Sequence, residues 1–96
     1  MTVLSNDDVQ KALSGLAGWS HEDDMLTKTY EFDNYLDGVA FAGAVGTIAQ
    51  GHGHHPDMMV TWRKVQVSFT THDEGSKVTE KDINAAKAIE ALGFPA

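Results

Sequence analysis

The chain has 96 residues, 42% of them hydrophobic, and its 14 acidic and 7 basic side chains give a formal net charge of −7. This length fits one domain, residues 1–96, which would bury roughly 60–65% of its unfolded surface and would gain from self-association. The charge opposes binding to nucleic acid, and the absence of cysteine excludes disulfides, thiolate catalysis and cysteine-based zinc sites. Because the sequence shows neither a signal-peptide pattern nor an apolar run of membrane-spanning length, we expect a cytoplasmic protein that does not contact a membrane.

The first segment carries the start signals of a helix. Ser5 can cap the helix, and Asp8, three residues later, completes the pattern of a capping box. The apolar stripe of this helix ends near Gly15 and Gly18 and consists of Val9, Ala12, Leu13 and Leu16.

A β-hairpin is expected next. Trp19 opens a short strand, and the polar residues 22–24 form the turn into a second strand. Side chains of the second strand alternate between the two faces of the sheet, which places on one face Leu26, Lys28, Tyr30 and Phe32.

A second helix is predicted to follow and to run to about Gln50, with Asp33 or Asn34 as its cap. It contains three interior glycines, and each lowers the helix propensity by about 1 kcal/mol relative to alanine. Close packing has to compensate for them, so we expect a buried, central helix. The glycines of residues 51–53 and then Pro56 end it.

The last part of the chain predicts a second hairpin and a third helix. The two strands cover residues 58–62 and 65–71, with a turn at Arg63-Lys64. Thr79 begins the helix and forms a capping box with Asp82, and Gly93 and Pro95 stop it.

The order of these elements predicts an α+β fold, α-β-β-α-β-β-α. The two hairpins form a four-stranded antiparallel sheet, and the three helices pack on one face of it. The other face carries polar residues and is left open or covered by another subunit.

Three histidines, His54 and His55 before Pro56 and then His72, are the candidate catalytic residues. The imidazole titrates closest to neutrality among side chains, so histidines brought together can donate and accept protons at pH 7. Pro56 keeps its segment extended, so the adjacent histidines should point in different directions.

Several short sequence motifs occur besides these histidines. Together with the order of the helices and strands, they make the chain resemble the pterin-4a-carbinolamine dehydratases over nearly its whole length. The enzymes of that family expel water from 4a-hydroxytetrahydropterin to give quinonoid dihydropterin. This step supports tetrahydrobiopterin recycling, and these enzymes need no metal or organic cofactor. The resemblance implies a hydro-lyase with a small-molecule pterin substrate that forms a homodimer or homotetramer. It rests on Gly18-Trp19, His54-His55-Pro56, Trp62-Arg63-Lys64-Val65, Ser68-Phe69-Thr70-Thr71-His72-Asp73 and Thr79-Glu80-Lys81-Asp82-Ile83.

The resemblance also implies roles for individual residues. His54 and His72 would transfer protons, and His55 would bind the substrate and assist catalysis. Asp82 matches an acidic residue of the family's site, where a carboxylate can orient an imidazole and favour its protonated form. Substrate binding would extend to two further residues, Thr71 and Trp19.

Two positions depart from the family pattern. Gln50 stands where many members carry a glutamate, four residues before the paired histidines, so any role for a charge there is lost or moved. The loop between His72 and Asp82 is one residue longer than usual, which leaves the place of Asp82 in the site open.

Structural interpretations stand beside these roles. Asp82 could do nothing except cap its helix, and Trp19 could be a core aromatic. His52, in its glycine-flanked loop, and His21, in the first hairpin, are expected at the surface.

Two other classes of function remain open. The first is a metal-binding module, because the histidines at positions 52, 54 and 55 with Asp57 or His72 would suffice for zinc, although the spacing matches no standard zinc motif. The second is a dimerisation cofactor of a transcription factor, a role that animal members resembling this chain also have. Stoichiometric zinc would identify the first, and a catalytically inactive variant that keeps its cellular role would identify the second.

Overall fold

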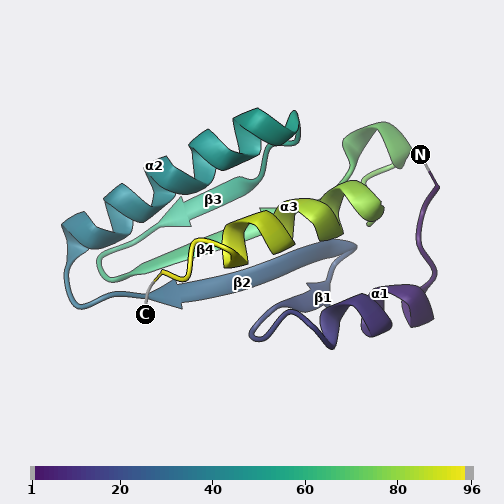
Figure 1. Ribbon diagram of the computed structural model, residues 1–96, viewed down its shortest axis with the longest axis horizontal. Coiled ribbons are helices and arrows are strands. Elements are labelled where there is room, and N and C mark those ends of the chain that lie inside the picture. Colours follow the sequence, from purple (N-terminus) through teal and green to yellow (C-terminus); the bar gives the residue numbers. More distant parts are fainter. Residues whose placement is uncertain (1, 95–96) are drawn as a thin grey trace.

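The order of helices and strands matches the predicted α+β arrangement. The computed structural model describes residues 2–94, and Figure 1 shows its helices and its four-stranded sheet. The elements in chain order are α1 (Asn6–Leu13), β1 (Ser20–Glu22), β2 (Met25–Glu31), α2 (Tyr35–His52), β3 (Asp57–Val60), β4 (Lys64–Phe69), the short 3-10 helix η1 (His72–Glu74) and α3 (Glu80–Glu90).

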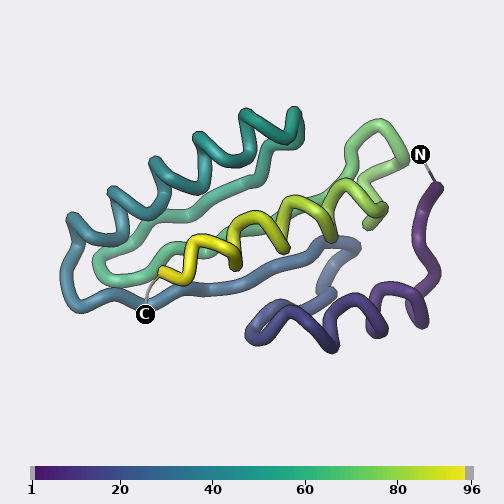
Figure 2. Tube along the Cα trace, in the orientation of Figure 1, coloured from purple at the N-terminus to yellow at the C-terminus, as the bar shows by residue number. Residues whose placement is uncertain are grey.

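Neighbouring strands of the sheet are antiparallel, in the order β1-β2-β4-β3. The register pairs Leu26 of β2 with Phe69 of β4, and Val60 of β3 with Val65 of β4. The trace in Figure 2 shows that the two hairpins lie side by side although α2 separates them in the chain. The central strands β2 and β4 therefore come from different hairpins.

One hydrophobic core lies between a face of the sheet and the helices. Val9 of α1, Phe41 and Val45 of α2, and Ile83 and Ile89 of α3 are at most 2% exposed. These residues belong to one cluster with the inward side chains of β2 and β4. The three helices therefore pack on the same face of the sheet, as predicted.

The helix caps are the predicted ones. Ser5 caps α1 by accepting the Asp8 N–H, which is one of the two bonds of the predicted capping box, and Asn34 is the one of the two candidate residues that caps α2. Thr79 caps α3 and forms a complete capping box with Asp82. Local sequence thus determines where each helix begins, since capping satisfies backbone N–H groups that have no partner within the helix.

The prediction that α2 is buried and central is wrong. Leu36 is 71% exposed and Val39 is 40% exposed. Of the interior glycines, Gly38 is packed closely, because a Cβ there would lie 3.4 Å from Cγ2 of Val65, whereas a Cβ at Gly43 would meet nothing within 4 Å. The helix packs against β3 and β4, so the sheet covers one side of it.

The two hairpins are present, but the limits of the second differ from the prediction. β3 ends at Val60, and Lys64 already pairs with Glu31 of β2. The turn therefore comprises residues 61–63, closed by a hydrogen bond of 2.9 Å from the Thr61 N–H to the Lys64 carbonyl. The predicted turn at Arg63-Lys64 is wrong, because β3 ends two residues earlier than predicted and Lys64 belongs to the β2–β4 ladder.

The C-terminal segment agrees with the prediction up to the last described residue. α3 ends at Glu90, and Gly93 follows with a φ of 64°. Pro95, the second predicted stop signal, lies outside the described residues. Within residues 2–94, the structure contains no helix with both the length and the apolar character that crossing a membrane requires.

Candidate active site

A small hollow lies where the end of α2, the residues after β4 and the first turn of α3 meet. Its volume is about 170 Å³. Enclosed sites for small molecules usually measure about 300–1,000 Å³, so this hollow would hold part of a ligand and leave the rest outside. The residues that line it are Gly53, His54, His55, Thr70, Thr71, His72, Asp73 and Lys81.

The end of α2 sets the direction of the segment that carries the paired histidines. Gly53 adopts a φ of 64°, in the left-handed region that favours glycine. Its N–H donates to the Gln50 carbonyl at 3.1 Å, and the His54 N–H donates to the Ala49 carbonyl at 3.2 Å. These two bonds form a Schellman motif, which turns the chain back at the helix end. The His54 ring then stacks on Phe69 of β4, with ring centroids 5.8 Å apart.

His54 points inward and pairs with Asp82. Its Nε2 lies 2.6 Å from Oδ1 of Asp82, and the two side chains are 12% and 0% exposed. With the Nε2–H donated to the carboxylate, Nδ1 is the ring nitrogen that remains for chemistry. The carboxylate fixes the orientation of the imidazole, so this pair is suited to a part in proton transfer.

The second oxygen of Asp82 holds the carboxylate in place. Oδ2 accepts a hydrogen bond from Thr71 Oγ1 and another from the Thr79 backbone N–H, both at 2.8 Å. Burying a charge is costly unless hydrogen bonds compensate it, and here the carboxylate has three donors including His54. From the sequence, capping the helix and orienting the imidazole were alternative roles for Asp82. In the structure Asp82 has both, because Oδ2 caps α3 and Oδ1 holds His54.

The other two histidines of the hollow are exposed. His55 Nε2 lies 2.7 Å from Oε1 of Gln50, and His72 Nδ1 lies 3.3 Å from Oγ of Ser76. His54 therefore points into the protein and His55 toward solvent, so the prediction that the adjacent side chains diverge is confirmed.

The structure brings the predicted site residues together with the exception of Trp19. Thr71 lines the hollow together with the three histidines, and Asp82 lies beneath it. Trp19 is 6% exposed and packs in the core, its ring centroid 6.1 Å from that of Phe69. It does not line the hollow, and its position is that of a core aromatic.

The two histidines expected at the surface differ from each other. His52 is exposed at the end of α2, as expected. His21 is half-buried, because it pairs with Leu26 in the β1–β2 ladder and faces the same side of the sheet.

Sequence reasoning did not assign a role to Lys81, which lines the hollow. It lies in the first turn of α3, directly before Asp82. That proximity was a usable signal, since a helix that brings Asp82 to a site also brings the neighbouring side chain near it. Lys81 adds a positive charge to a hollow that otherwise offers histidines, threonines and Asp73.

The ligands required by the zinc alternative do not converge. Within residues 2–94, no three histidine, aspartate or glutamate side chains are placed to hold one metal ion. The paired histidines point apart, and His52 remains exposed at the helix end. The arrangement on which that alternative depended is therefore not formed.

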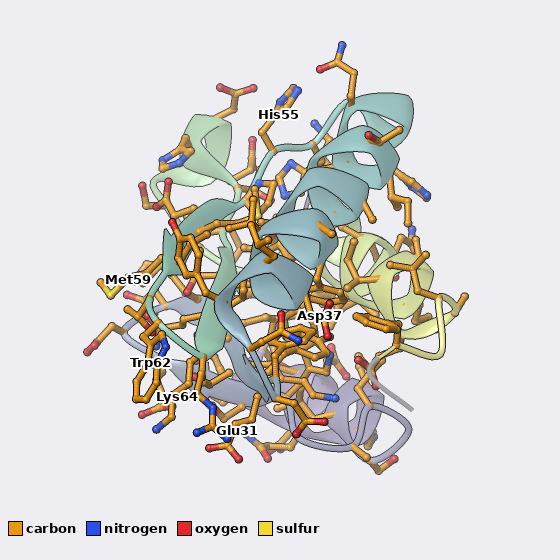
Figure 3. All side chains as sticks on the ribbon, turned by 90° about the vertical axis from the view of Figure 1, so that its left-hand side faces the viewer. Glu31, Asp37, His55, Met59, Trp62 and Lys64 are labelled. Carbon is orange, nitrogen blue, oxygen red and sulfur yellow. The ribbon has the colours of Figure 1, made fainter. Side chains whose placement is uncertain are left out.

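A larger hollow of about 530 Å³ lies at the other end of the sheet. Figure 3 shows His55 at the opposite end of the molecule from Trp62, Lys64 and Glu31, which line this second hollow. It contains no histidine, so acid/base chemistry by imidazoles belongs to the smaller hollow. Its full lining is Glu31, Phe32, Asp33, Thr61, Trp62, Arg63 and Lys64.

Comparisons with known sequences point to one family. The family model described as pterin 4 alpha carbinolamine dehydratase matches residues 2–92. A protein of Natronomonas pharaonis that is provisionally named a pterin-4-alpha-carbinolamine dehydratase is 43% identical over 89 residues, which cover 93% of this chain and 94% of the relative. A protein of Thermosynechococcus vestitus with the same provisional name is 40% identical over 89 residues, covering 93% of each chain.

Solved structures agree with this family. A transcriptional coactivator/pterin dehydratase from Brucella melitensis superimposes with a TM-score of 0.87 at 28% identity, covering 95% of this chain and 98% of that one. A pterin dehydratase-like protein described as a RuBisCO assembly factor in the alpha-carboxysome shares the fold alone, with a TM-score of 0.62 at 20% identity over 81% of this chain and 89% of that one. Since the family model spans residues 2–92 and relatives above 30% identity cover nearly the whole chain, this protein belongs to the pterin-4-alpha-carbinolamine dehydratase family.

Proposed function

We propose that this chain eliminates water from 4a-hydroxytetrahydropterin to give quinonoid dihydropterin. The observation that carries the proposal is the buried Asp82 carboxylate that holds His54 at a hollow shared with His55 and His72. Membership of the family supports a pterin as the substrate. The hollow supports acid/base chemistry because it gathers three imidazoles.

The reaction requires two proton transfers. The C4a–O bond breaks with its electron pair on oxygen, which takes up a proton and leaves as water. A ring N–H loses its proton, and its electrons form the new C=N double bond at C4a. No electrons pass to or from another reagent, so groups that donate and accept protons suffice, and each contributes about 10²–10⁴-fold.

His54 fits the role of the acid that protonates the leaving oxygen. Asp82 holds the ring through Nε2, and stacking on Phe69 restricts the ring's orientation further. His72 is the second group proposed to transfer a proton, and the neighbouring Lys81 could bind a carbonyl oxygen of the pterin. His55 and Thr71 are proposed to contact the substrate.

A direct assay tests this function. Synthetic 4a-hydroxytetrahydropterin should lose water faster with the protein than without it, which ultraviolet absorbance follows. His54→Ala and His72→Ala should each lower kcat by about 10- to 10⁴-fold, and the double variant should lose more.

His52→Ala is the matched control for these variants. It removes a histidine from the same end of α2, but this histidine does not line the hollow, so the rate should stay that of the wild type. A wild-type protein without activity above background, or two single variants at the wild-type rate, would refute the proposed function.

We also propose that this activity serves tetrahydrobiopterin recycling. Quinonoid dihydropterin is an oxidised pterin that a reductase can return to the tetrahydro form. Added to an aromatic amino acid hydroxylase and its pterin, the protein should prevent the accumulation of the 4a-hydroxy intermediate. Accumulation at the same level would argue against this role.

The exposed apolar residues support a homo-oligomer, which we propose as the form of the protein in solution. The edge strand β3 exposes Met58, Met59 and Val60, and the nearby turn exposes Trp62. Contiguous exposed apolar side chains are uncommon on monomers and mark interaction surfaces.

Binding to another protein is the second candidate function. The related Brucella melitensis protein is described as a transcriptional coactivator as well as a pterin dehydratase. In this chain the exposed side of α2, with Leu36 and Val39, favours such a role. A His54→Ala variant that lacks dehydratase activity but keeps the cellular role of the protein would identify it, and a variant that loses both would exclude it.

A further inference from the structure

The two adjacent histidines of the hollow have hydrogen-bond partners of different charge. His54 donates to the buried carboxylate of Asp82 at 2.6 Å, whereas His55 Nε2 lies 2.7 Å from the neutral amide oxygen of Gln50. An amide oxygen accepts a hydrogen bond from an imidazole N–H but carries no net charge that would stabilise an imidazolium. The two neighbouring rings are therefore oriented by a carboxylate in one case and by a neutral amide in the other.

The end of α2 fixes the backbone of Gln50 relative to that of His55. Gln50 belongs to the last turn of α2, and its carbonyl accepts the Gly53 N–H of the Schellman motif. His55 follows on the extended segment that Pro56 restricts, so the geometry of the helix end brings the two side chains within hydrogen-bond distance.

No carboxylate takes the place of Gln50 at the His55 ring. Within residues 2–94, His54 is the histidine that forms an ion pair with an acidic side chain. The other titratable or charged groups that share the hollow are His72, Asp73 and Lys81, and the described contacts of His55 do not include them.

We propose that Gln50 is a positioning residue that orients the His55 ring, with Nε2 as donor to the amide oxygen and Nδ1 free as acceptor. The inference deepens the proposed dehydratase function and rests on it for its catalytic part. His55, in contact with the substrate, would then be the base that takes the proton from the pterin ring nitrogen, and the proton transfer proposed for His72 would be to the leaving oxygen, as for His54. His54, held by Asp82, would deliver a proton to the leaving oxygen, so the two adjacent rings have opposite tasks.

Nuclear magnetic resonance titration of the histidine rings tests the contact without any substrate. In Gln50→Glu a charged partner replaces the neutral one, so the pH midpoint at which the His55 ring takes up a proton should rise by about 0.5–1 unit, a modest shift for an exposed pair. The midpoints of His52 and His21 should not move. Gln10→Glu, which adds the same charge on the exposed surface of α1, is the matched control and should leave His55 unchanged.

Kinetics of the same variants test the role of His55 as a base. A base must be unprotonated, so in Gln50→Glu the acid limb of the pH–rate profile should move to higher pH by the amount of the titration shift. Gln50→Leu, which removes the acceptor, should lower kcat by about 10-fold with little change in KM.

The possible results separate the two proposals. An unmoved His55 titration in Gln50→Glu overturns the contact between Gln50 and His55. A moved titration with an unmoved acid limb overturns the assignment of His55 as the base. A wild-type protein without dehydratase activity refutes the proposed function, while the titration still decides whether Gln50 holds His55.

Discussion

At the scale of single residues, Asp82 links the stability of the fold to the chemistry of the site. Its Oδ2 accepts from the Thr79 N–H and from the Thr71 hydroxyl, and its Oδ1 accepts from His54. An asparagine could keep one acceptor oxygen toward the backbone but would present a neutral group to the imidazole. Substituting this residue therefore tests catalysis and capping separately.

We expect Asp82→Asn to change activity more than stability. The alkaline limb of the pH–rate profile should move to lower pH, because His54 loses the charge that stabilises its protonated form, and kcat should fall by about 10- to 10³-fold. Urea denaturation should show a loss of about 1 kcal/mol, since the cap remains. An unchanged profile with reduced stability would leave Asp82 as a capping residue alone.

At the scale of elements, both ends of α3 are attached to the rest of the fold. The N-terminal end carries the capping box and Asp82. Near the C-terminal end, Glu90 accepts hydrogen bonds from Lys28 Nζ, at 3.0 and 3.1 Å, and from the Tyr30 hydroxyl at 2.5 Å. Both donors belong to β2, so this cluster fixes α3 along the strand and supports the position of its first turn at the hollow.

The charges of this cluster depend on pH. Partial burial by itself would raise the pKa of the Glu90 carboxyl, but the hydrogen bonds from Tyr30 and Lys28 outweigh it and hold that pKa below its usual range. Burial raises the pKa of the Tyr30 phenol, and the Glu90 carboxylate raises it further. A carboxyl group whose pKa is lower in the folded state stabilises the fold above its unfolded pKa, and this contribution is lost as the pH falls through the folded pKa.

Glu90→Gln should therefore lower the free energy of unfolding by about 1–2 kcal/mol at pH 7. The difference in free energy of unfolding between variant and wild type should shrink as the pH falls below about 4.5, the ordinary pKa of glutamate. At low pH the wild-type carboxyl is protonated and, like the glutamine, carries no charge. Urea denaturation at pH 7 and pH 3 measures both quantities. Glu31→Gln, which removes a carboxylate from the exposed pair with Lys64, should change stability little, and an equal loss in both variants would contradict this account.

At the scale of the whole molecule, the two edges of the sheet differ. β1 is three residues long and contacts α1, whereas β3 pairs with β4 on one side and exposes apolar side chains, with Met59 at 61%. An uncovered apolar edge strand favours pairing with another strand, and a two-fold axis would place two β3 strands antiparallel.

Light scattering at micromolar concentration should therefore report a mass of at least twice the 10.4 kDa of one chain. Met59→Lys should reduce that mass, because a charge on an edge strand opposes strand pairing. Leu36→Lys, which places the same charge on the exposed side of α2, should leave it unchanged. A wild-type mass near 10.4 kDa would contradict self-association, and a loss of mass in Leu36→Lys alone would move the interface to α2.

Much of the fold follows from rules that act within a few residues. Ser5, Asn34 and Thr79 cap the helices as their sequence context predicts, and the alternation in β2 and β4 identifies the buried face. The burial of α2 could not be predicted in this way. Its composition is apolar on all sides, and only the placement of the sheet determines which side is covered.

The candidate site divides in the same way. Residue type and short spacings are enough to predict the three histidines, the extended segment before Pro56 and the capping box of Asp82. The contact between Asp82 and His54, 28 residues apart, and the place of Trp19 in the core depend on how the elements pack. The contact of His55 with Gln50 depends on the same packing. The physical reason is that these partners meet only when the end of α2 and the first turn of α3 pack around β4, and local propensity does not determine that packing.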